Sequence, residues 1–213
     1  MDILPSLICI TTDNSIFSHQ EQVLAFIGKG ARFVQIRSKA LDKDELGRQV
    51  EQSLKYVKES GALLIVNDFL DLVRDFAVSG VHLGVNDCSV ERARELLGAD
   101  AIIGSTVHNL DDAIKVKELG LCDYVGLGPI RGSRTKLDLA PVLSKETIDE
   151  ILNLLSPLPV YLIGGIELSD CDLISRYDIA GIAVCSALSQ GSGCGNQVGH
   201  FIEYLESSNL NMV

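Results

Sequence analysis

Eight short apolar segments alternate with amphipathic stretches along this chain, and the alternation limits the fold more than any other feature. The apolar segments are rich in β-branched residues and are continuous, which is typical of parallel strands buried on both faces. They lie at Leu7–Thr11, Phe33–Ile36, Ala62–Val66, Gly80–Leu83, Ala101–Ile103, Tyr124–Leu127, Val160–Ile163 and Ile179–Cys185. We therefore expect eight strands separated by helices.

The stretches between these segments carry apolar residues at helical spacing. Several of them end at glycine, as Asp42–Ser60 does before Gly61, which is a common helix stop. They lie at Gln20–Gly30, Asp42–Ser60, Asp68–Val78, Val90–Leu97, Asp111–Leu119, Lys145–Leu155, Asp170–Tyr177 and Val198–Leu205. Eight strand-then-helix units predict an α/β fold, a single (β/α)₈ TIM barrel over residues 1–213 with a frayed tail from about residue 207. An open doubly wound sheet is the alternative, but no GxGxxG follows the first strand.

Composition narrows the classes of partner. The chain of 213 residues has a formal net charge of −11, which argues against general nucleic-acid binding. No apolar run is long enough to span a membrane, and no basic leader precedes an apolar core. The six cysteines are scattered without a CxxC pair, as expected for small buried side chains in a reducing compartment. We expect a cytoplasmic protein without nucleic-acid or membrane partners, and a homo-oligomer stays open.

A basic loop stands out against this acidic background. Residues 123–138 read DYVGLGPIRGSRTKLD, a strand that is followed by small hydroxyl residues and cations. Glycine-exposed N–H groups, hydroxyl donors and positive side chains are what a phosphate or diphosphate requires. The candidate residues are Ser133, Arg134, Thr135 and Lys136. A solvated surface loop with ordinary basic residues is the competing interpretation.

The second predicted strand ends in a polar run. Alternation places Gln35, Arg37 and Lys39 on one side of this strand and Ile36 on the other, with Ser38 between the two cations. Three in-line polar groups are unusual inside a strand, and a guanidinium beside an ammonium suits a diphosphate. The carboxyl ends of barrel strands meet at one mouth, so this run is a candidate site there.

Acidic residues follow the third and fourth predicted strands. Asn67 and Asp68 come directly after strand three, and Asp87 follows strand four and its His82. Asn67 could instead cap a helix, and the two acids could be ordinary first-turn or loop residues. Two carboxylates opposite several cations are, however, how Mg²⁺ is held when it also binds substrate phosphates. We interpret His82 as an inward-facing barrel histidine.

The remaining strand ends supply hydroxyl groups and glycines. Thr106 follows strand five and could donate to a ligand ring nitrogen or cap the next helix, while His108 is a base or a structural histidine. Gly165 follows strand seven, and Cys185 and Ser186 follow strand eight, where this fold often binds phosphate. The sequence thus predicts two anion sites in one mouth, a Mg²⁺-diphosphate site and a monophosphate site.

Taken together, these motifs resemble those of the thiamine-phosphate synthase family. They occur in family order across most of the chain, as FVQIRSK, IVNDFLDL, GVHLGVND, IIGSTVH, DYVGLGPIRGSRTK, LIGGI and AVCSAL. The family is a group of transferases that join hydroxymethylpyrimidine diphosphate to hydroxyethylthiazole phosphate and release diphosphate. The resemblance implies these two small molecules as substrates and Mg²⁺ as cofactor.

The resemblance also implies roles for individual residues. Asp68 and Asp87 would bind Mg²⁺, and Thr106 would lie close to the pyrimidine ring. The expected catalytic groups, which stabilise charge and position the ring, are Lys136, Arg37, Lys39 and Thr106. The pyrimidine diphosphate would be held by Gln35, Ile36, Arg37, Ser38, Lys39 and Asn67. The thiazole phosphate would be held by Ser133, Arg134, Thr135, Gly165, Cys185 and Ser186.

The chain departs from the family pattern at a few positions. Thr106 stands where the family usually has serine, Val85 where it has glutamine, and Arg131 and Arg134 lie in a loop that usually lacks them. Two alternatives stay open. One is a thiazole tautomerase-like enzyme that would use His108 as base, and the other is a non-catalytic barrel that binds thiamine phosphate.

Overall fold

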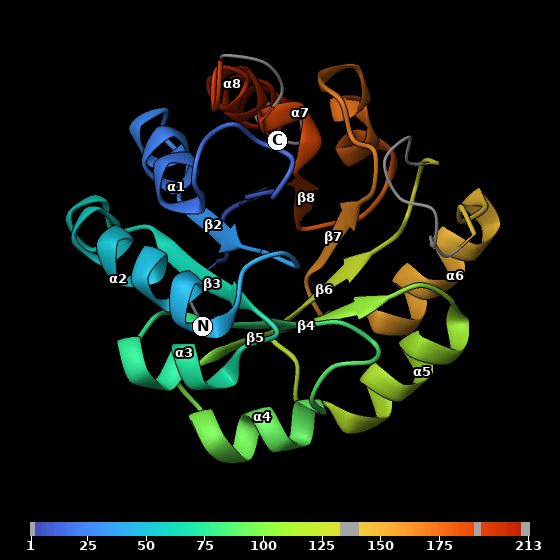
Figure 1. Cartoon of the computed structure of the whole chain (residues 1–213). Helices are drawn as coiled ribbons and strands as arrows, with labels where there is room; N and C mark the ends of the chain where they lie inside the picture. The colour runs from blue at the N-terminus through green and yellow to red at the C-terminus, as the bar shows by residue number, and fades with distance from the viewer. Residues whose placement is uncertain (1–2, 133–140, 190–192, 210–213) are drawn as a thin grey trace.

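The computed structural model describes residues 3–132, 141–189 and 193–209, and its centre is a closed barrel of eight parallel strands (Figure 1). Each strand pairs with the next along the chain, and the last pairs with the first, so the sheet has no open edge. The strands are β1 (Leu7–Ile10), β2 (Phe33–Ile36), β3 (Leu63–Asn67), β4 (Gly80–Leu83), β5 (Ile102–Val107), β6 (Tyr124–Leu127), β7 (Val160–Ile163) and β8 (Gly181–Val184). The predicted (β/α)₈ barrel is confirmed.

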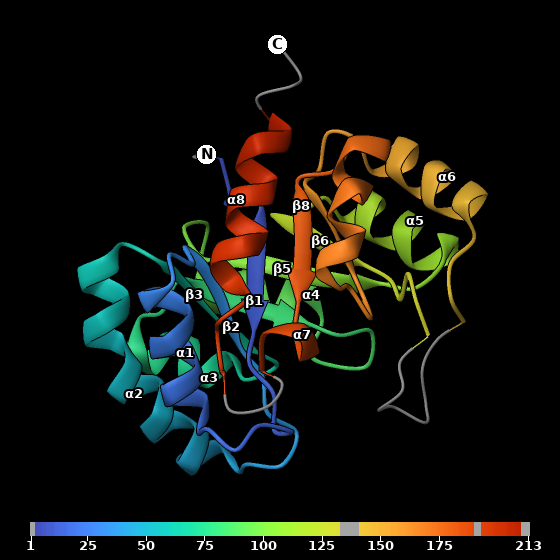
Figure 2. The same cartoon turned by 90° about the horizontal axis from the view of Figure 1, so that it is seen from above.

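Helices surround the strands in the order that the sequence predicts (Figures 1 and 2). They are α1 (His19–Gly28), α2 (Lys43–Ser60), α3 (Leu70–Phe76), α4 (Val90–Leu97), α5 (Leu110–Leu119), α6 (Lys145–Leu155), the 3₁₀ helix η1 (Leu168–Arg176), α7 (Ser186–Ser189) and α8 (Val198–Asn209). The segment after β7 is therefore a 3₁₀ helix. Helix α8 continues to Asn209, past the residue at which we expected fraying to begin. Within the described ranges, no helix combines the length and apolar character needed to cross a membrane.

Side-chain caps start most of these helices at the end of a loop. In each case a polar side chain accepts a hydrogen bond from the backbone N–H three residues later, which satisfies one of the free donors of the first turn. The capping residues are Ser18, Asp42, Ser89, Asn109 and Ser144. The helix starts are thus encoded locally, directly after the loops that form the mouth of the barrel.

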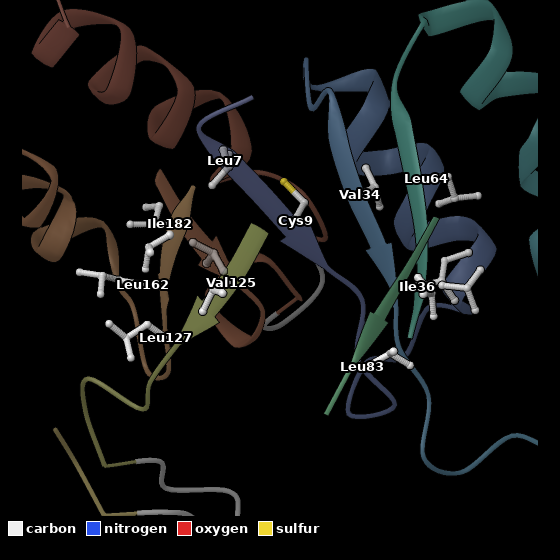
Figure 3. Close-up of a cluster of buried hydrophobic side chains, with 14 of the residues drawn as sticks. Leu7, Cys9, Val34, Ile36, Leu64, Leu83, Val125, Leu127, Leu162 and Ile182 are labelled. Carbon is white, nitrogen blue, oxygen red and sulfur yellow. The ribbon is translucent and has the colours of Figure 1, made fainter. Parts of the chain in front are cut away.

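Alternation along the strands divides the buried side chains into two sets. One set points outward to the helices and includes Leu7, Cys9, Val34 and Ile36 (Figure 3). The other fills the barrel interior and consists of Ile8, Ile10, Phe33, Ile65, Tyr124, Tyr161 and Ala183. Because both faces of each strand are buried, the apolar segments of the sequence are continuous.

Two strands extend further toward the mouth than their apolar segments indicate. Strand β3 includes Asn67, and β5 includes Thr106 and ends at Val107. Helix α3 begins only at Leu70 with Phe69 as its N-cap residue, so Asn67 does not cap it. The side chains of Asn67 and Thr106 are therefore positioned by the sheet.

The opposite end of the barrel is held by a partly buried ion pair. The Arg94 guanidinium donates to the Asp123 carboxylate over 2.8 Å and to the Leu121 carbonyl over 2.9 Å. Asp123 also accepts from the Ile103 N–H over 2.7 Å. This contact joins helix α4 to the beginnings of β5 and β6, far from the carboxyl ends of the strands.

Candidate active site

The end of β2 points one polar and one apolar side chain in opposite directions. The Gln35 amide is buried and donates to Asn67 Oδ1 of β3 over 3.1 Å. Ile36 packs outward among the helices (Figure 3), so any ligand contact of this residue would come from its backbone. The paired amides of Gln35 and Asn67 line the floor of the mouth, where their remaining donor and acceptor atoms can bind a polar ring.

The segment after β2 is held by a carboxylate of the β1–α1 loop. Asp13 accepts a hydrogen bond from the backbone N–H of Lys39 over 2.8 Å and a short one from the Ser38 hydroxyl. The ring of His19 contacts the same carboxylate, with Nε2 3.1 Å from Oδ1. Burial acts to raise the pKa of Asp13, but these three groups outweigh it and lower the pKa. Asp13 therefore stays ionised and fixes the backbone that carries Lys39.

A threonine at the end of β1 completes this arrangement. The Thr11 hydroxyl is buried, accepts from the Arg37 N–H over 3.0 Å and lies 2.7 Å from His19 Nδ1. Thr11, Asp13 and His19 were not among the expected site residues. The rule that polar residues at the ends of barrel strands face the mouth points to Thr11 and Asp13, because Thr11 is the last residue of the first apolar segment and Asp13 lies two residues beyond it.

Lys39 and Asp68 form an ion pair at the mouth. Lys39 Nζ lies 2.5 Å from Asp68 Oδ2, and the Asp68 side chain is only 16% exposed. Burial, together with the neighbouring Asp87, raises the pKa of Asp68, and Lys39 acts in the opposite direction. The backbone of Asp68 adopts a positive φ of 66°, which strains a non-glycine residue. This strained turn places the carboxyl group against Asp87.

Asp87 is oriented by the tight turn that follows β4. Its Oδ2 atom accepts from the Gly84 N–H over 2.7 Å. Burial acts to raise the pKa of Asp87, but hydrogen bonding with Asp68 and with the Gly84 N–H lowers it. A Cβ atom at position 84 would lie 2.7 Å from Asp87 Oδ2, so any other residue would displace this carboxylate from the Gly84 N–H. The two carboxyl groups thus face each other with opposite pKa shifts.

The donor atoms of this pair fit a divalent cation. Asp68 Oδ1 is buried and has no hydrogen-bond partner among the described residues, which is costly unless an ion or water binds there. Within the described residues, no site brings together three or more His, Cys, Asp or Glu side chains that could hold a metal ion. Two carboxylates, with water and substrate oxygens completing the shell, are the ligand set that Mg²⁺ commonly uses.

His82 lies beneath the carboxylates inside the barrel. Its Nδ1 is 3.0 Å from the Tyr124 hydroxyl, and its Nε2 is 3.0 Å from the Thr106 hydroxyl. Burial and the positive charge of Arg37 lower the pKa of His82 to about 4, although Asp87 acts against this. The ring is therefore neutral near pH 7 and belongs to the interior, as the sequence predicts.

The far side of the mouth is described only in part. His108 Nδ1 donates to the Gly128 carbonyl over 2.6 Å. The Cys185 thiol lies 3.8 Å from the Thr11 carbonyl, and Ser186 begins the short helix α7. The predicted residues Ser133, Arg134, Thr135 and Lys136 lie outside the described residues.

Gly165 lies beside the basic loop in the turn after β7. A Cβ atom added at this position would be 3.0 Å from Arg131 Cβ. The Arg131 guanidinium pairs with the buried Asp170 carboxylate of η1. Arg131, which departs from the usual family pattern, is thus tied to the helix that follows β7 and shapes this side of the mouth.

The closed barrel, with charged and polar groups at the carboxyl ends of its strands, places the chain among the (β/α)₈-barrel enzymes, whose active sites lie at this end. A family model described as thiamine monophosphate synthase matches residues 7–188. The chain therefore belongs to the thiamine monophosphate synthase family, which confirms the resemblance seen in its motifs.

Individual relatives agree with this assignment. A thiamine-phosphate synthase from Phocaeicola vulgatus is 34% identical over 183 residues, which cover 84% of this chain and 88% of that protein. One from Methanosarcina barkeri is 32% identical over 179 residues, covering 84% of this chain and 80% of that protein. The solved structure of thiamine phosphate pyrophosphorylase from Pyrococcus furiosus is 26% identical, with a TM-score of 0.84 over 95% of this chain and 96% of that one.

Proposed function

We propose that this chain joins hydroxymethylpyrimidine diphosphate to hydroxyethylthiazole phosphate, forms thiamine phosphate and releases diphosphate. One observation carries the proposal: Lys39 and the facing carboxyl groups of Asp68 and Asp87 lie together at the mouth. A cation beside two carboxylates is the arrangement that a Mg²⁺-diphosphate leaving group needs. Membership of the synthase family supports the same reaction.

The proposed cation site consists of Asp68 and Asp87. The unpartnered Asp68 Oδ1 and the adjacent Asp87 carboxylate would be its protein ligands. Bound Mg²⁺ would neutralise charge on the diphosphate oxygens. Lys39 would contribute positive charge from the opposite side, and its ion pair with Asp68 keeps its ammonium group at the site.

The reaction then needs charge stabilisation and positioning. The bond between the pyrimidine methylene carbon and the diphosphate oxygen breaks, and the electron pair leaves with the diphosphate. Arg37 and Lys39 stabilise that leaving charge, and the predicted Lys136 would add to them. The electron-rich aminopyrimidine delocalises the cation, and the thiazole nitrogen donates its lone pair to form the new C–N bond. The scheme requires no protein nucleophile.

The pyrimidine would be recognised by polar groups on the floor of the mouth. Gln35 and Asn67 offer amide donors and acceptors, and Thr106 offers a partly exposed hydroxyl. Ser38 supports this site through its bond to Asp13, which holds the segment between Arg37 and Lys39. The thiazole phosphate contacts stay predictions, at Ser133, Arg134, Thr135, Gly165, Cys185 and Ser186.

Diphosphate release tests the proposal. We would measure it with each substrate alone and with both, in the presence and absence of Mg²⁺. Release that requires both substrates and Mg²⁺ is the expected result. Turnover of the thiazole phosphate alone would indicate a tautomerase that uses His108, and binding without turnover would indicate a non-catalytic barrel.

We also infer a cytoplasmic location. None of the six cysteines forms a disulfide, and four of them have a pKa raised by burial, namely Cys9, Cys122, Cys171 and Cys194. Unreactive buried thiols fit a reducing compartment.

A further inference from the structure

A chain of three side chains crosses the barrel interior below the mouth. Tyr124 of β6, His82 of β4 and Thr106 of β5 are joined by two contacts of 3.0 Å each. Strand β5 lies between the other two, and its Gly104 is in register with both His82 and Tyr124. Thr106 lies two residues further toward the mouth and is the only one of the three that is not buried.

Gly104 has no side chain, and this leaves room for the Tyr124 ring beside His82 and Thr106. A Cβ atom there would lie 2.2 Å from Tyr124 Cζ and 2.5 Å from its hydroxyl oxygen. Any other residue would displace the Tyr124 ring, because such distances are far below van der Waals contact. Glycine in the middle of a strand is otherwise unfavourable, so its presence indicates a specific close approach.

Counting hydrogen atoms favours one direction for each of these two bonds. The Tyr124 hydroxyl is fully buried, and its one hydrogen-bond partner in the described part of the chain is His82 Nδ1. A buried phenol that does not donate its hydrogen loses a hydrogen bond, so Tyr124 donates and Nδ1 accepts. His82 then carries its proton on Nε2 and donates it to the Thr106 oxygen. The Thr106 hydroxyl hydrogen then has no acceptor among the described residues.

We propose that Tyr124 and His82 are positioning residues that make Thr106 a hydrogen-bond donor to an unprotonated ring nitrogen of the substrate. The proposal rests on the proposed function, because it assigns the ring to the pyrimidine diphosphate. With the opposite tautomer, Nε2 would accept from Thr106, and the threonine could offer the ring only a lone pair.

This arrangement has a chemical consequence for the leaving-group step. A hydroxyl donor orients the ring nitrogen without transferring a proton to it. A protonated ring would withdraw electrons from the methylene carbon, whereas a neutral ring can delocalise the cation that forms there. Thr106 would therefore select the neutral ring and keep it electron-rich.

The tautomer can be measured without substrate. We would record long-range ¹H–¹⁵N correlations of the histidine rings in the full-length protein and assign His82 by its loss in His82→Gln. The expected spectrum shows a neutral ring protonated at Nε2. A ring protonated at Nδ1, or at both nitrogens, would overturn the proposal whether or not the chain is a synthase.

Kinetics test the coupling to Thr106. Tyr124→Phe removes the donor to His82 and should lower kcat/KM for the pyrimidine diphosphate by about three-fold, since the ring then holds either tautomer. Tyr161→Phe is the matched control, because that buried interior tyrosine donates to the Pro5 carbonyl over 2.9 Å at the other end of the barrel. It should keep the wild-type kcat/KM.

A double-mutant cycle separates positioning from a general loss of stability. Thr106→Val should lower kcat/KM by about ten-fold, and Thr106→Ser should restore it, because serine keeps the hydroxyl. Adding Tyr124→Phe to Thr106→Val should produce no further loss. A full additional loss in the double variant, or equal losses in Tyr124→Phe and Tyr161→Phe, would show that the tyrosine acts only through packing.

Discussion

Asp13→Asn is the substitution that most directly tests how the site is built. In the native protein one carboxylate accepts from the Ser38 hydroxyl, the Lys39 N–H and His19 Nε2. An asparagine of the same shape has only one oxygen, so its amide N–H₂ must face at least one of these donors. The segment that carries Arg37 and Lys39 should then move away from the position at which it would meet the diphosphate.

The expected magnitude follows from the bonds that are lost. One hydrogen bond to a charged acceptor disappears and a donor faces a donor, which together cost about 2 kcal/mol at this partly exposed site. If half of that cost is expressed in binding, KM for the pyrimidine diphosphate rises by about five-fold. The thiazole phosphate would bind the opposite side of the mouth, so its KM should change by less than about two-fold.

Steady-state kinetics with each substrate varied in turn provide the assay, and urea unfolding provides the stability change. Asp42→Asn is the matched control, because Asp42 caps α2 through one bond to the Glu45 N–H and asparagine caps equally well. An equal rise in both KM values, or no rise in either, would refute the positioning role of Asp13.

The same variant carries a pH test. The pKa of Asp13 is lowered in the folded protein from its ordinary value of 3.8. The stabilisation by its charge is therefore fully present above pH 3.8 and is lost as the pH falls through the lower folded pKa. The difference in unfolding free energy between wild type and Asp13→Asn should be constant from about pH 7 to 5 and shrink only below the ordinary pKa. A difference that already shrinks near neutral pH would contradict this assignment.

Three further substitutions test other parts of the molecule. Gly84→Ala would place a Cβ atom 2.7 Å from Asp87 Oδ2, so Mg²⁺ affinity measured by calorimetry should fall by about ten-fold with the fold intact. Lys39→Met should lower kcat by about 100-fold, because the cation proposed to face the leaving group is lost, and a near-normal rate at saturating substrate and Mg²⁺ would remove Lys39 from the mechanism. Arg94→Met leaves a carboxylate uncompensated and should cost about 3 kcal/mol in urea unfolding without changing either KM.

The sequence predicted the barrel because both faces of its strands are buried, so eight continuous apolar segments mark the strands directly. It did not predict how far β3 and β5 extend. Asn67 and Thr106 are polar, and apolar segments end before polar residues even where backbone pairing continues. The segment after β7 has the apolar spacing of a helix, and this spacing does not separate an α-helix from the observed 3₁₀ helix.

The candidate site was predictable where the residues follow strands 2 to 4, because the topology alone brings those strand ends together. The Asp13 contacts were missed, since the segment TTDNS after the first strand has the composition of an ordinary turn. The hydrogen-bonded row of side chains formed by Tyr124, His82 and Thr106 was also missed. It depends on the register between β4, β5 and β6, which sequence spacing does not specify.

The rings of Phe33, Tyr124 and Tyr161 meet edge to face inside the barrel, with centroids 5.5 to 6.0 Å apart. They fill the barrel interior, so no channel runs along the barrel axis. A ligand can reach the candidate site only from the mouth at the carboxyl ends of the strands. Two substrates that enter through the mouth must also leave through it as products. Under the proposed reaction, thiamine phosphate and diphosphate would both leave through this mouth, and product release would then limit kcat.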